Sequence, residues 1–228
     1  MNTKRQAAPS DTFAHTSVNP LFPTPMWIAD LPGPAFQPLN DRLRAAVDAM
    51  TGPRVQQNPS DTFQTPHDLH ERAEFAPLVH AIETLVGGAL KQLAIEPAEV
   101  VFTAMWANVN PPGSKHSVHS HPNNFFSGVY YVQCDPRANV ICFYDPRPQA
   151  EVMMPSRAQQ TVFTTNMVEL EAKPGRLALF PAWLKHDVPI NLSQRERISV
   201  SFNLMFPQFT ERMAVPMWRG GKDKRVGG

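Results

Sequence analysis

The stretch KHSVHSHPNNFFSGVYYVQ, residues 115–133, places three of the chain's eight histidines ahead of an aromatic and β-branched run. That run has the composition of a strand, and Pro-Asn-Asn before it indicates a turn. Side chains at positions i and i+2 of a strand point to the same side. We therefore expect His119 and His121 to project together, as two metal ligands would. His116 is expected on the opposite strand face, as a pocket or surface residue.

The rest of the chain predicts a β-rich α+β fold, a β-sandwich or jelly roll with N-terminal helices packed on one sheet. Residues 21–32 are typical of a short edge strand that is interrupted by prolines. Two helices are expected at 40–52 and 74–95. Short turn segments then separate seven candidate strands, which are 99–110, 126–134, 139–146, 161–170, 175–181, 185–190 and 197–206.

Residues 20–215 are expected to form a single domain, between a flexible arm at 1–19 and a loose tail at 216–228. In the first helix, Asn40 or Asp41 is a candidate cap. The second helix carries Gly87-Gly88 in its middle, which is expected where a helix packs closely on a sheet.

Composition excludes several classes of protein. Apolar residues make up 42% of the 228 positions, enough for a real core, and the net charge is +1. No basic stripe indicates nucleic acid as a partner. No apolar run approaches the roughly 18 residues that cross a bilayer, and the N-terminus lacks a signal-peptide pattern, so we expect a cytoplasmic protein without a membrane partner. Cys134 and Cys142 are expected to be reduced thiols. The sequence leaves the oligomeric state open.

A third histidine, His186 in FPAWLKHDVPI, follows the His-x-His pair after a long β-rich insert. A double-stranded β-helix brings ligands in this order together, because its first and late strands are neighbours in space. Three protein ligands leave positions free for a co-substrate and dioxygen, as in non-haem Fe(II) sites.

The stretch RISVSF at 197–202 begins with an arginine, although the rest of it has the composition of a buried strand. Arg197 and Ser199 share one face of this strand. A buried guanidinium is costly unless it is paired, and its planar fork binds a carboxylate at two points. Ligand binding is the favoured interpretation. The alternative is an Arg that is solvated at the strand's start or paired with Glu171 or Glu196.

Taken in order, the motifs HSHPNNFFSGVYYVQ, FYDPRP, PGRLALFPAWLKHDVP and RISVSFNLMF resemble those of 2-oxoglutarate/Fe(II)-dependent oxygenases related to prolyl hydroxylases. The resemblance covers roughly residues 20–208. It implies a double-stranded β-helix, one Fe(II) and 2-oxoglutarate as co-substrate. It also implies dioxygen as oxidant, release of succinate and CO2, and hydroxylation of a C–H bond in a small-molecule or amino-acid-like substrate.

Carried over by motif, His119 and His186 match the two ligand histidines of that family. His121 stands where prolyl hydroxylase relatives have an aspartate. Either His121 is the third ligand, or a carboxylate or water completes the site. No catalytic residue beyond the metal ligands is implied.

The co-substrate residues follow in the same way. Arg197 matches the residue that pairs with the distal carboxylate of 2-oxoglutarate, and Ser199 the hydroxyl after it. Tyr131 matches a tyrosine that donates to the same carboxylate. Asn108 falls near a position that contacts the metal-proximal end. The expected pocket mouth comprises Trp106, Asn123 and Trp183.

Two other functions fit parts of the pattern. A cupin-like three-histidine dioxygenase would not use 2-oxoglutarate, and Arg197 argues against it. A non-catalytic metal-binding jelly roll would keep the histidines without turnover.

Overall fold

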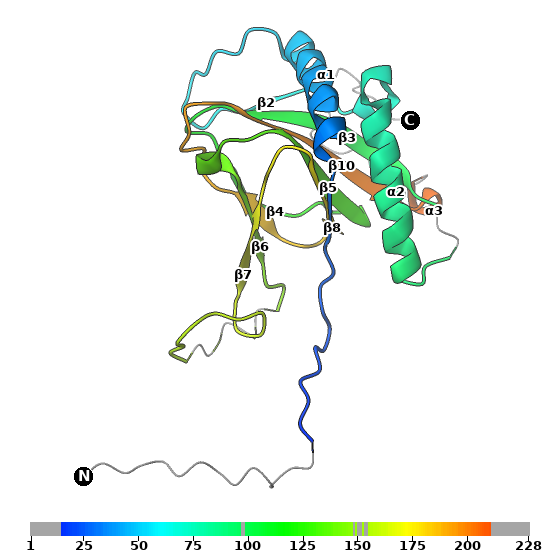
Figure 1. Cartoon of the computed structure of the whole chain (residues 1–228), viewed down its shortest axis with the longest axis vertical. Coiled ribbons are helices and arrows are strands. Elements are labelled where there is room, and N and C mark those ends of the chain that lie inside the picture. The colour runs from blue at the N-terminus through cyan, green and yellow to red at the C-terminus, as the bar shows by residue number, and fades with distance from the viewer. Residues whose placement is uncertain (1–14, 97–98, 148, 150–151, 153–154, 211–228) are drawn as a thin grey trace, which may run out of the picture.

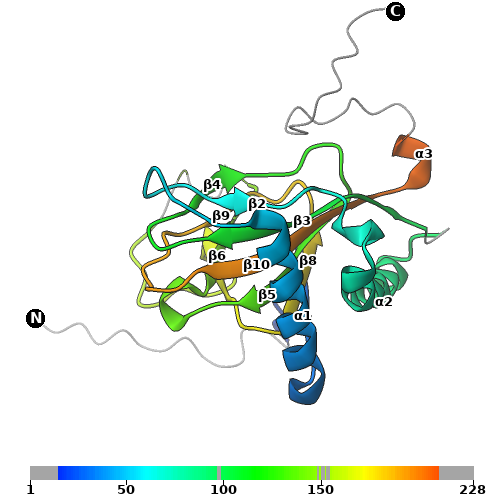
Figure 2. The same ribbon diagram turned by 90° about the horizontal axis from the view of Figure 1, so that it is seen from above.

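Two antiparallel sheets pack face to face, and two long helices cover the outer face of the larger sheet (Figures 1 and 2). The structure, a computed structural model, describes residues 15–96, 99–147, 149, 152 and 155–210. The predicted β-rich α+β fold, a jelly roll with N-terminal helices on one sheet, is confirmed.

The larger sheet contains six strands and the smaller sheet four. In spatial order, the larger sheet consists of β1 (Trp27–Asp30), β8 (Arg176–Pro181), β5 (Phe126–Gln133), β10 (Arg197–Met205), β3 (Val101–Asn110) and β2 (Phe63–Gln64). The smaller sheet consists of β4 (His116–His119), β9 (His186–Val188), β6 (Val140–Tyr144) and β7 (Met167–Glu171). Strands from distant parts of the chain are therefore neighbours, as the order of the histidines requires.

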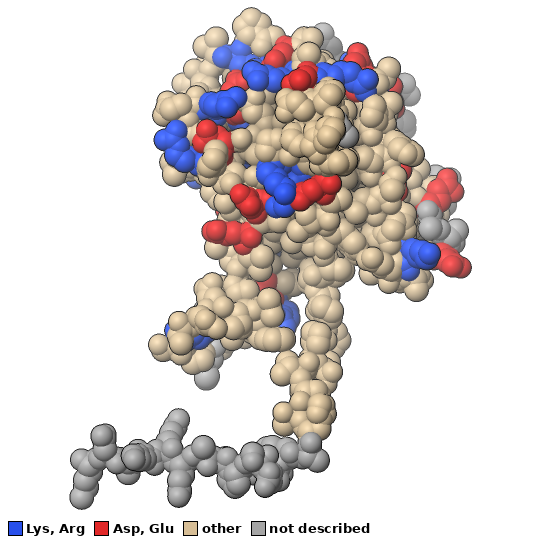
Figure 3. Space-filling model, in the orientation of Figure 1, with Lys and Arg blue, Asp and Glu red and all other residues tan. Residues whose placement is uncertain are grey.

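The helical elements lie between the strands and after the last one. They are α1 (Gly33–Thr51), α2 (Ala76–Gln92), α3 (Pro207–Thr210) and the 3-10 turns η1 (Leu69–Glu71), η2 (Ala73–Phe75) and η3 (Pro136–Ala138). Within the described ranges, no helix is both long enough and apolar enough to cross a membrane. Acidic and basic side chains are interspersed over the face shown in Figure 3, without a basic stripe.

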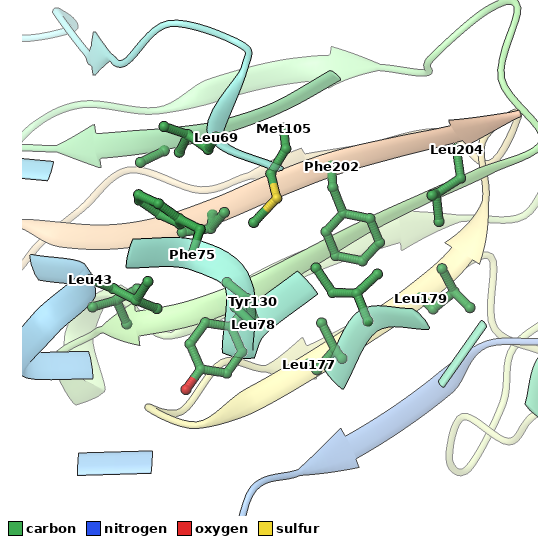
Figure 4. Packing of buried hydrophobic residues seen from close by; sticks show 14 of the residues in the cluster. Leu43, Leu69, Phe75, Leu78, Met105, Tyr130, Leu177, Leu179, Phe202 and Leu204 are labelled. Carbon is green, nitrogen blue, oxygen red and sulfur yellow. The ribbon is translucent and has the colours of Figure 1, made fainter. Parts of the chain in front are cut away.

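Alternation along the strands of the larger sheet separates its core from its inner face. On β3, Met105, Ala107 and Val109 belong to the apolar cluster beneath the helices (Figure 4). The side chains between them, such as Trp106 and Asn108, line a pocket on the opposite side. One strand thus builds both the hydrophobic core and the pocket wall.

Two predictions about the helices were wrong. Helix α1 begins at Gly33 because Pro34 fits its first turn, so Asn40 lies inside the helix rather than at its cap. Asn40 is buried, donates to the Val132 carbonyl at 2.8 Å and accepts from the Tyr130 hydroxyl at 2.7 Å. The Gly87-Gly88 pair makes no close approach to a sheet, since a Cβ at either position would meet nothing within 4 Å.

Most strand predictions were confirmed to within a few residues, with two exceptions. The strand expected at 161–170 begins at Met167, after a turn in which Thr161 and Thr164 bond to each other. Strands β2 and β4 lie outside the seven candidate ranges, although the His-x-His interpretation assumed strand geometry at His119.

A close contact at Gly128 gives a test of the packing. A Cβ there would lie 2.2 Å from Cζ of buried Phe202 and 2.7 Å from the Ala178 carbonyl oxygen. Gly128→Ala should lower the free energy of unfolding by about 1–3 kcal/mol, because neither neighbour can move freely. Gly87→Ala, at a position with open space around it, should raise the free energy of unfolding by about 0.5–1 kcal/mol. The gain comes from higher helix propensity and from the lower entropy of the unfolded chain. Urea unfolding followed by circular dichroism measures both. A Gly128→Ala protein as stable as the parent would contradict the packing described.

Candidate functional site

Three imidazoles converge between the sheets. The ligating nitrogens of His119, His121 and His186 all lie within 4.8 Å of one another. His119 ends β4 and pairs directly with His186, the first residue of β9. The ring centroids are 4.4 Å apart for this pair and 5.1 and 5.2 Å from each of them to His121. This is a group that could hold a metal ion.

Hydrogen bonds set the tautomers of two of these rings. Nδ1 of His119 lies 2.7 Å from the Ser117 carbonyl oxygen, and Nδ1 of His186 lies 2.8 Å from that of Leu184. A carbonyl oxygen only accepts, so each Nδ1 carries the hydrogen. Each Nε2 then keeps its lone pair, which is the form that binds a metal.

His121 reaches the cluster by a different route from the one predicted. Strand β4 ends at His119, so the expectation that the two share one strand was wrong. The backbone N–H of His121 instead donates to the Ala182 carbonyl at 2.9 Å, which ties it to the turn before His186. Burial, with the neighbouring histidines, lowers the pKa of His121 to about 3; burial likewise lowers the pKa of His186 to about 4. Both rings are therefore neutral near pH 7, as ligands must be.

A buried cation lies in the same pocket. Arg197 is 3% exposed, and its Nη2 donates to Oδ1 of Asn110 at 3.2 Å. Its Nε has no hydrogen-bond partner among the described residues, and neither has the buried hydroxyl of Tyr131. Burial lowers the pKa of the guanidinium, although an arginine remains charged near neutrality. The arrangement leaves a place for an anion.

The alternative partners of Arg197 are occupied elsewhere. Glu196 accepts two hydrogen bonds from Arg54, at 3.0 and 2.7 Å. Glu171 accepts one from Asn139 at 3.3 Å. The alternative interpretation of Arg197 as a solvated or surface-paired residue was wrong, because the residue is buried and neither acid contacts it.

Polar side chains from three neighbouring strands form a row beside this cation. In the register of the sheet, Ser199 of β10 lies opposite Asn108 of β3 and Tyr131 of β5. The Asn108 amide accepts from Gln64 at 2.8 Å and from the Trp106 indole at 3.1 Å. It donates to Ser201 at 2.9 Å. The three residues lie opposite one another although the pairing of β10 with β5 shifts register between Ile198 and Ser199.

The pocket between the sheets contains most of the expected residues. It is lined by Gln64, Trp106, Asn108, His116, His119, His121, Gly128, Val129, Tyr131, Ile141, Phe180, His186, Val188, Arg197, Ser199 and Ser201.

Two of the expected mouth residues lie outside that pocket. Trp183 is 54% exposed and lines a larger hollow next to it, of about 840 Å³. Asn123 is exposed in the turn after His121, where its φ of 64° is a conformation that Asn tolerates better than most residues. Trp106 lies inside the pocket, 4.9 Å from the His67 ring and 6.1 Å from that of His121.

Sequence reasoning missed Asn110 and misplaced His116. The two are joined by a 2.7 Å contact between Asn110 Nδ2 and His116 Nε2. An irregularity in the pairing of β4 between His116 and His119 turns both side chains toward the pocket, so the expected opposite faces were wrong. Asn110 had a signal, because it continues the i, i+2 series of Trp106 and Asn108 with a third polar residue on a buried strand.

The model of the family described as "Putative 2OG-Fe(II) oxygenase" matches residues 104–203, which contain all three clustered histidines and Arg197. Over these residues the chain matches the 2OG-Fe(II) oxygenase family. No curated protein sequence matches it.

Solved structures of similar fold include several oxygenases of this kind. The epimerase SnoN from nogalamycin biosynthesis is 12% identical, with a TM-score of 0.57 over 85% of this chain and 89% of that one. A Pseudomonas putida prolyl-4-hydroxylase is 15% identical, with a TM-score of 0.53 over 80% and 93%. HygX from Streptomyces hygroscopicus, crystallised with nickel, 2-oxoglutarate and hygromycin B, is 12% identical, with a TM-score of 0.55 over 81% and 84%. At these identities the likeness shows the double-stranded β-helix fold.

The description of the matching family implies Fe(II) and 2-oxoglutarate as cofactors. The residues present fit both. Two histidines offer an unprotonated Nε2 toward a common centre. In the same pocket, a buried guanidinium and a buried phenol have unused donors, which suit a carboxylate.

Metal binding should depend on the histidine cluster. Ni(II), a redox-inert substitute, should raise the melting temperature of the wild-type protein, because a ligand at 100 times its Kd adds about 2.7 kcal/mol. His186→Ala should abolish this rise and the saturable heat of Ni(II) binding in calorimetry. His80→Ala, at an exposed position on α2, is the control and should behave like wild type. Undiminished Ni(II) affinity in His186→Ala would show that the metal binds elsewhere.

Proposed function

We propose that this oxygenase hydroxylates a C–H bond in a small-molecule or amino-acid-like substrate, with Fe(II) held by His119, His121 and His186. The observation that carries the proposal is a buried Arg197 with a free Nε in the pocket that the three imidazoles share. A buried cation without a carboxylate partner among the described residues favours an anionic co-substrate there.

The distal carboxylate of 2-oxoglutarate is assigned to Arg197, Tyr131 and Ser199. Charge-assisted hydrogen bonds of this kind are about twice as strong as neutral ones. Asn108 is assigned to the metal-proximal end, and its hydrogen bonds with Gln64, Trp106 and Ser201 fix its amide in the pocket wall.

When bound, Fe(II) and 2-oxoglutarate would supply the oxidant: 2-oxoglutarate would lose CO2 and become succinate by taking one oxygen atom of dioxygen, and the other atom would enter the product. The chain itself supplies orientation and a dry pocket. Ile141, Phe180 and Val188 form an apolar wall beside the histidines, which excludes water from the reacting centre. The carbonyl groups of Ser117 and Leu184 keep the ligand hydrogens at Nδ1.

The substrate is proposed to enter from the larger hollow beside Trp183. Residues of the N-terminal segment 19–26 and of the segment that leads into β7 line this hollow. Leu184 and Phe143 line it and also contact His186, through a backbone hydrogen bond and a ring contact at 5.8 Å. Asn123, in the nearby turn, is proposed to contact the outer part of the substrate.

A cytoplasmic location is also proposed. Cys134 and Cys142 are both free thiols. Burial raises the pKa of each to about 11, so they stay protonated and unreactive in a reducing compartment.

Turnover of 2-oxoglutarate tests the proposal. Fe(II)-loaded protein should form succinate, slowly without substrate and faster with one, and a metabolite panel should yield a product heavier by one oxygen atom. Arg197→Ala should raise the KM for 2-oxoglutarate by about 100-fold, because hydrogen bonds to charged groups contribute about 1.5–3 kcal/mol each. Arg137→Ala, with a side chain 62% exposed on η3, is the control and should leave the KM unchanged.

A wild-type protein that binds Fe(II) but never forms succinate would contradict the proposal. It would favour a three-histidine site that works without 2-oxoglutarate, or one that does not catalyse.

A further inference from the structure

A hydrogen-bonded chain of three side chains crosses from one sheet to the other at the end of the pocket that contains Arg197. Arg197 of β10 donates to Oδ1 of Asn110 on β3 at 3.2 Å. Nδ2 of Asn110 lies 2.7 Å from Nε2 of His116 on β4. Asn110 is 1% exposed, and both Arg197 and His116 line the pocket.

The chemistry of the three groups fixes the direction of this chain. A guanidinium only donates, so the Asn110 atom that faces it must be the amide oxygen. The amide nitrogen, which only donates, then faces His116. Nε2 of His116 must accept, and in the neutral ring the hydrogen lies on Nδ1. Among the residues that the structure describes, no partner receives this Nδ1–H.

This relay of Arg197, Asn110 and His116 is also fixed by hydrogen bonds from a residue outside it. Nδ2 of Asn191 donates to the backbone carbonyl of Asn110 at 2.9 Å and to that of Arg195 at 2.8 Å. These bonds tie the end of β3 to the turn before β10. Asn110 is therefore placed firmly, and small movements of its amide would misalign both Arg197 and His116.

We propose that His116 is a further 2-oxoglutarate-binding residue, whose Nδ1–H donates to the distal carboxylate beside Arg197, and that Asn110 is the positioning residue that aligns the two. This rests on the proposed function of the pocket. A carboxylate offers about four lone-pair sites, more than one guanidinium can fill. A neutral imidazole adds a donor without the repulsion that a second cation would exert on Arg197.

The test compares two ligands on the Ni(II)-loaded full chain by calorimetry, which needs no turnover. 2-Oxoglutarate carries the distal carboxylate, and 2-oxopentanoate has the same five carbons and keto acid but lacks it. His116→Phe keeps an aromatic ring at this position and removes the donor. It should weaken 2-oxoglutarate binding by about tenfold or more and change 2-oxopentanoate binding by less than about twofold. His80→Phe, at an exposed position, is the control and should change neither.

The positioning role of Asn110 has its own readout. Asn110→Ala should weaken 2-oxoglutarate binding at least as much as His116→Phe, because it releases both ends of the relay. The double variant should bind no more than about twofold worse than Asn110→Ala alone, since the two residues act as one unit. Independent, additive losses would overturn the relay.

The outcomes separate this inference from the function on which it rests. If the wild-type protein binds no 2-oxoglutarate, the proposed function fails. If it binds and His116→Phe binds equally well, or loses both ligands equally, the role of His116 is wrong. Ni(II) affinity and thermal unfolding show whether each variant is folded. Should His116→Phe not fold, His116→Gln keeps an N–H donor and should retain 2-oxoglutarate binding to within about tenfold; loss of both ligands in that variant would also overturn the inference.

Discussion

The pocket depends on one buried positive charge. Arg197 lies between two sheets, where a cation that is not compensated costs several kcal/mol. Among the described residues its side chain makes one hydrogen bond, to Asn110, while the hydroxyl groups of Ser199 and Tyr131 lie on the same wall. In the proposed function, the distal carboxylate of 2-oxoglutarate would supply the remaining acceptors and the opposite charge. The same buried cation that costs folding free energy would then favour a dicarboxylate over a monocarboxylate.

Regular alternation in β3, β5 and β10 lets this polar wall coexist with a hydrophobic core. Residues such as Val109, Tyr130 and Val200 face helices α1 and α2, and their neighbours face the pocket. Because each strand serves both sides, a shift of register by one residue would bury Asn108 in the core and expose apolar side chains to the pocket. The helices thus stabilise the site indirectly, by fixing which face of the sheet is polar.

The sequence predicts best where alternation continues along a strand. Asn108, Ser199 and Tyr131 could be assigned to one wall because each follows the i, i+2 series of its own strand, although the pairing of β5 with β10 shifts register between Ile198 and Ser199. The series also contained Asn110, whose significance appears only when its contacts with Arg197 and His116 are seen. Local irregularity defeats the same reasoning. The shift in β4 turns His116 into the pocket, and His121 reaches the cluster from beyond the strand's end through a hydrogen bond to Ala182. Neither a bulge nor a long-range backbone contact has a periodic signature in the sequence.

A histidine in place of an aspartate at position 121 changes the charge of the site. Three imidazole ligands would leave a divalent ion its full charge, whereas an aspartate would cancel one unit. Burial keeps the rings of His121 and His186 neutral, as their lowered pKa values indicate. In the proposed complex, the two carboxylates of 2-oxoglutarate would meet positive charge at both ends, the metal at one and Arg197 at the other. The remaining positions around the distal carboxylate would then suit neutral donors, the role proposed for Tyr131, Ser199 and His116.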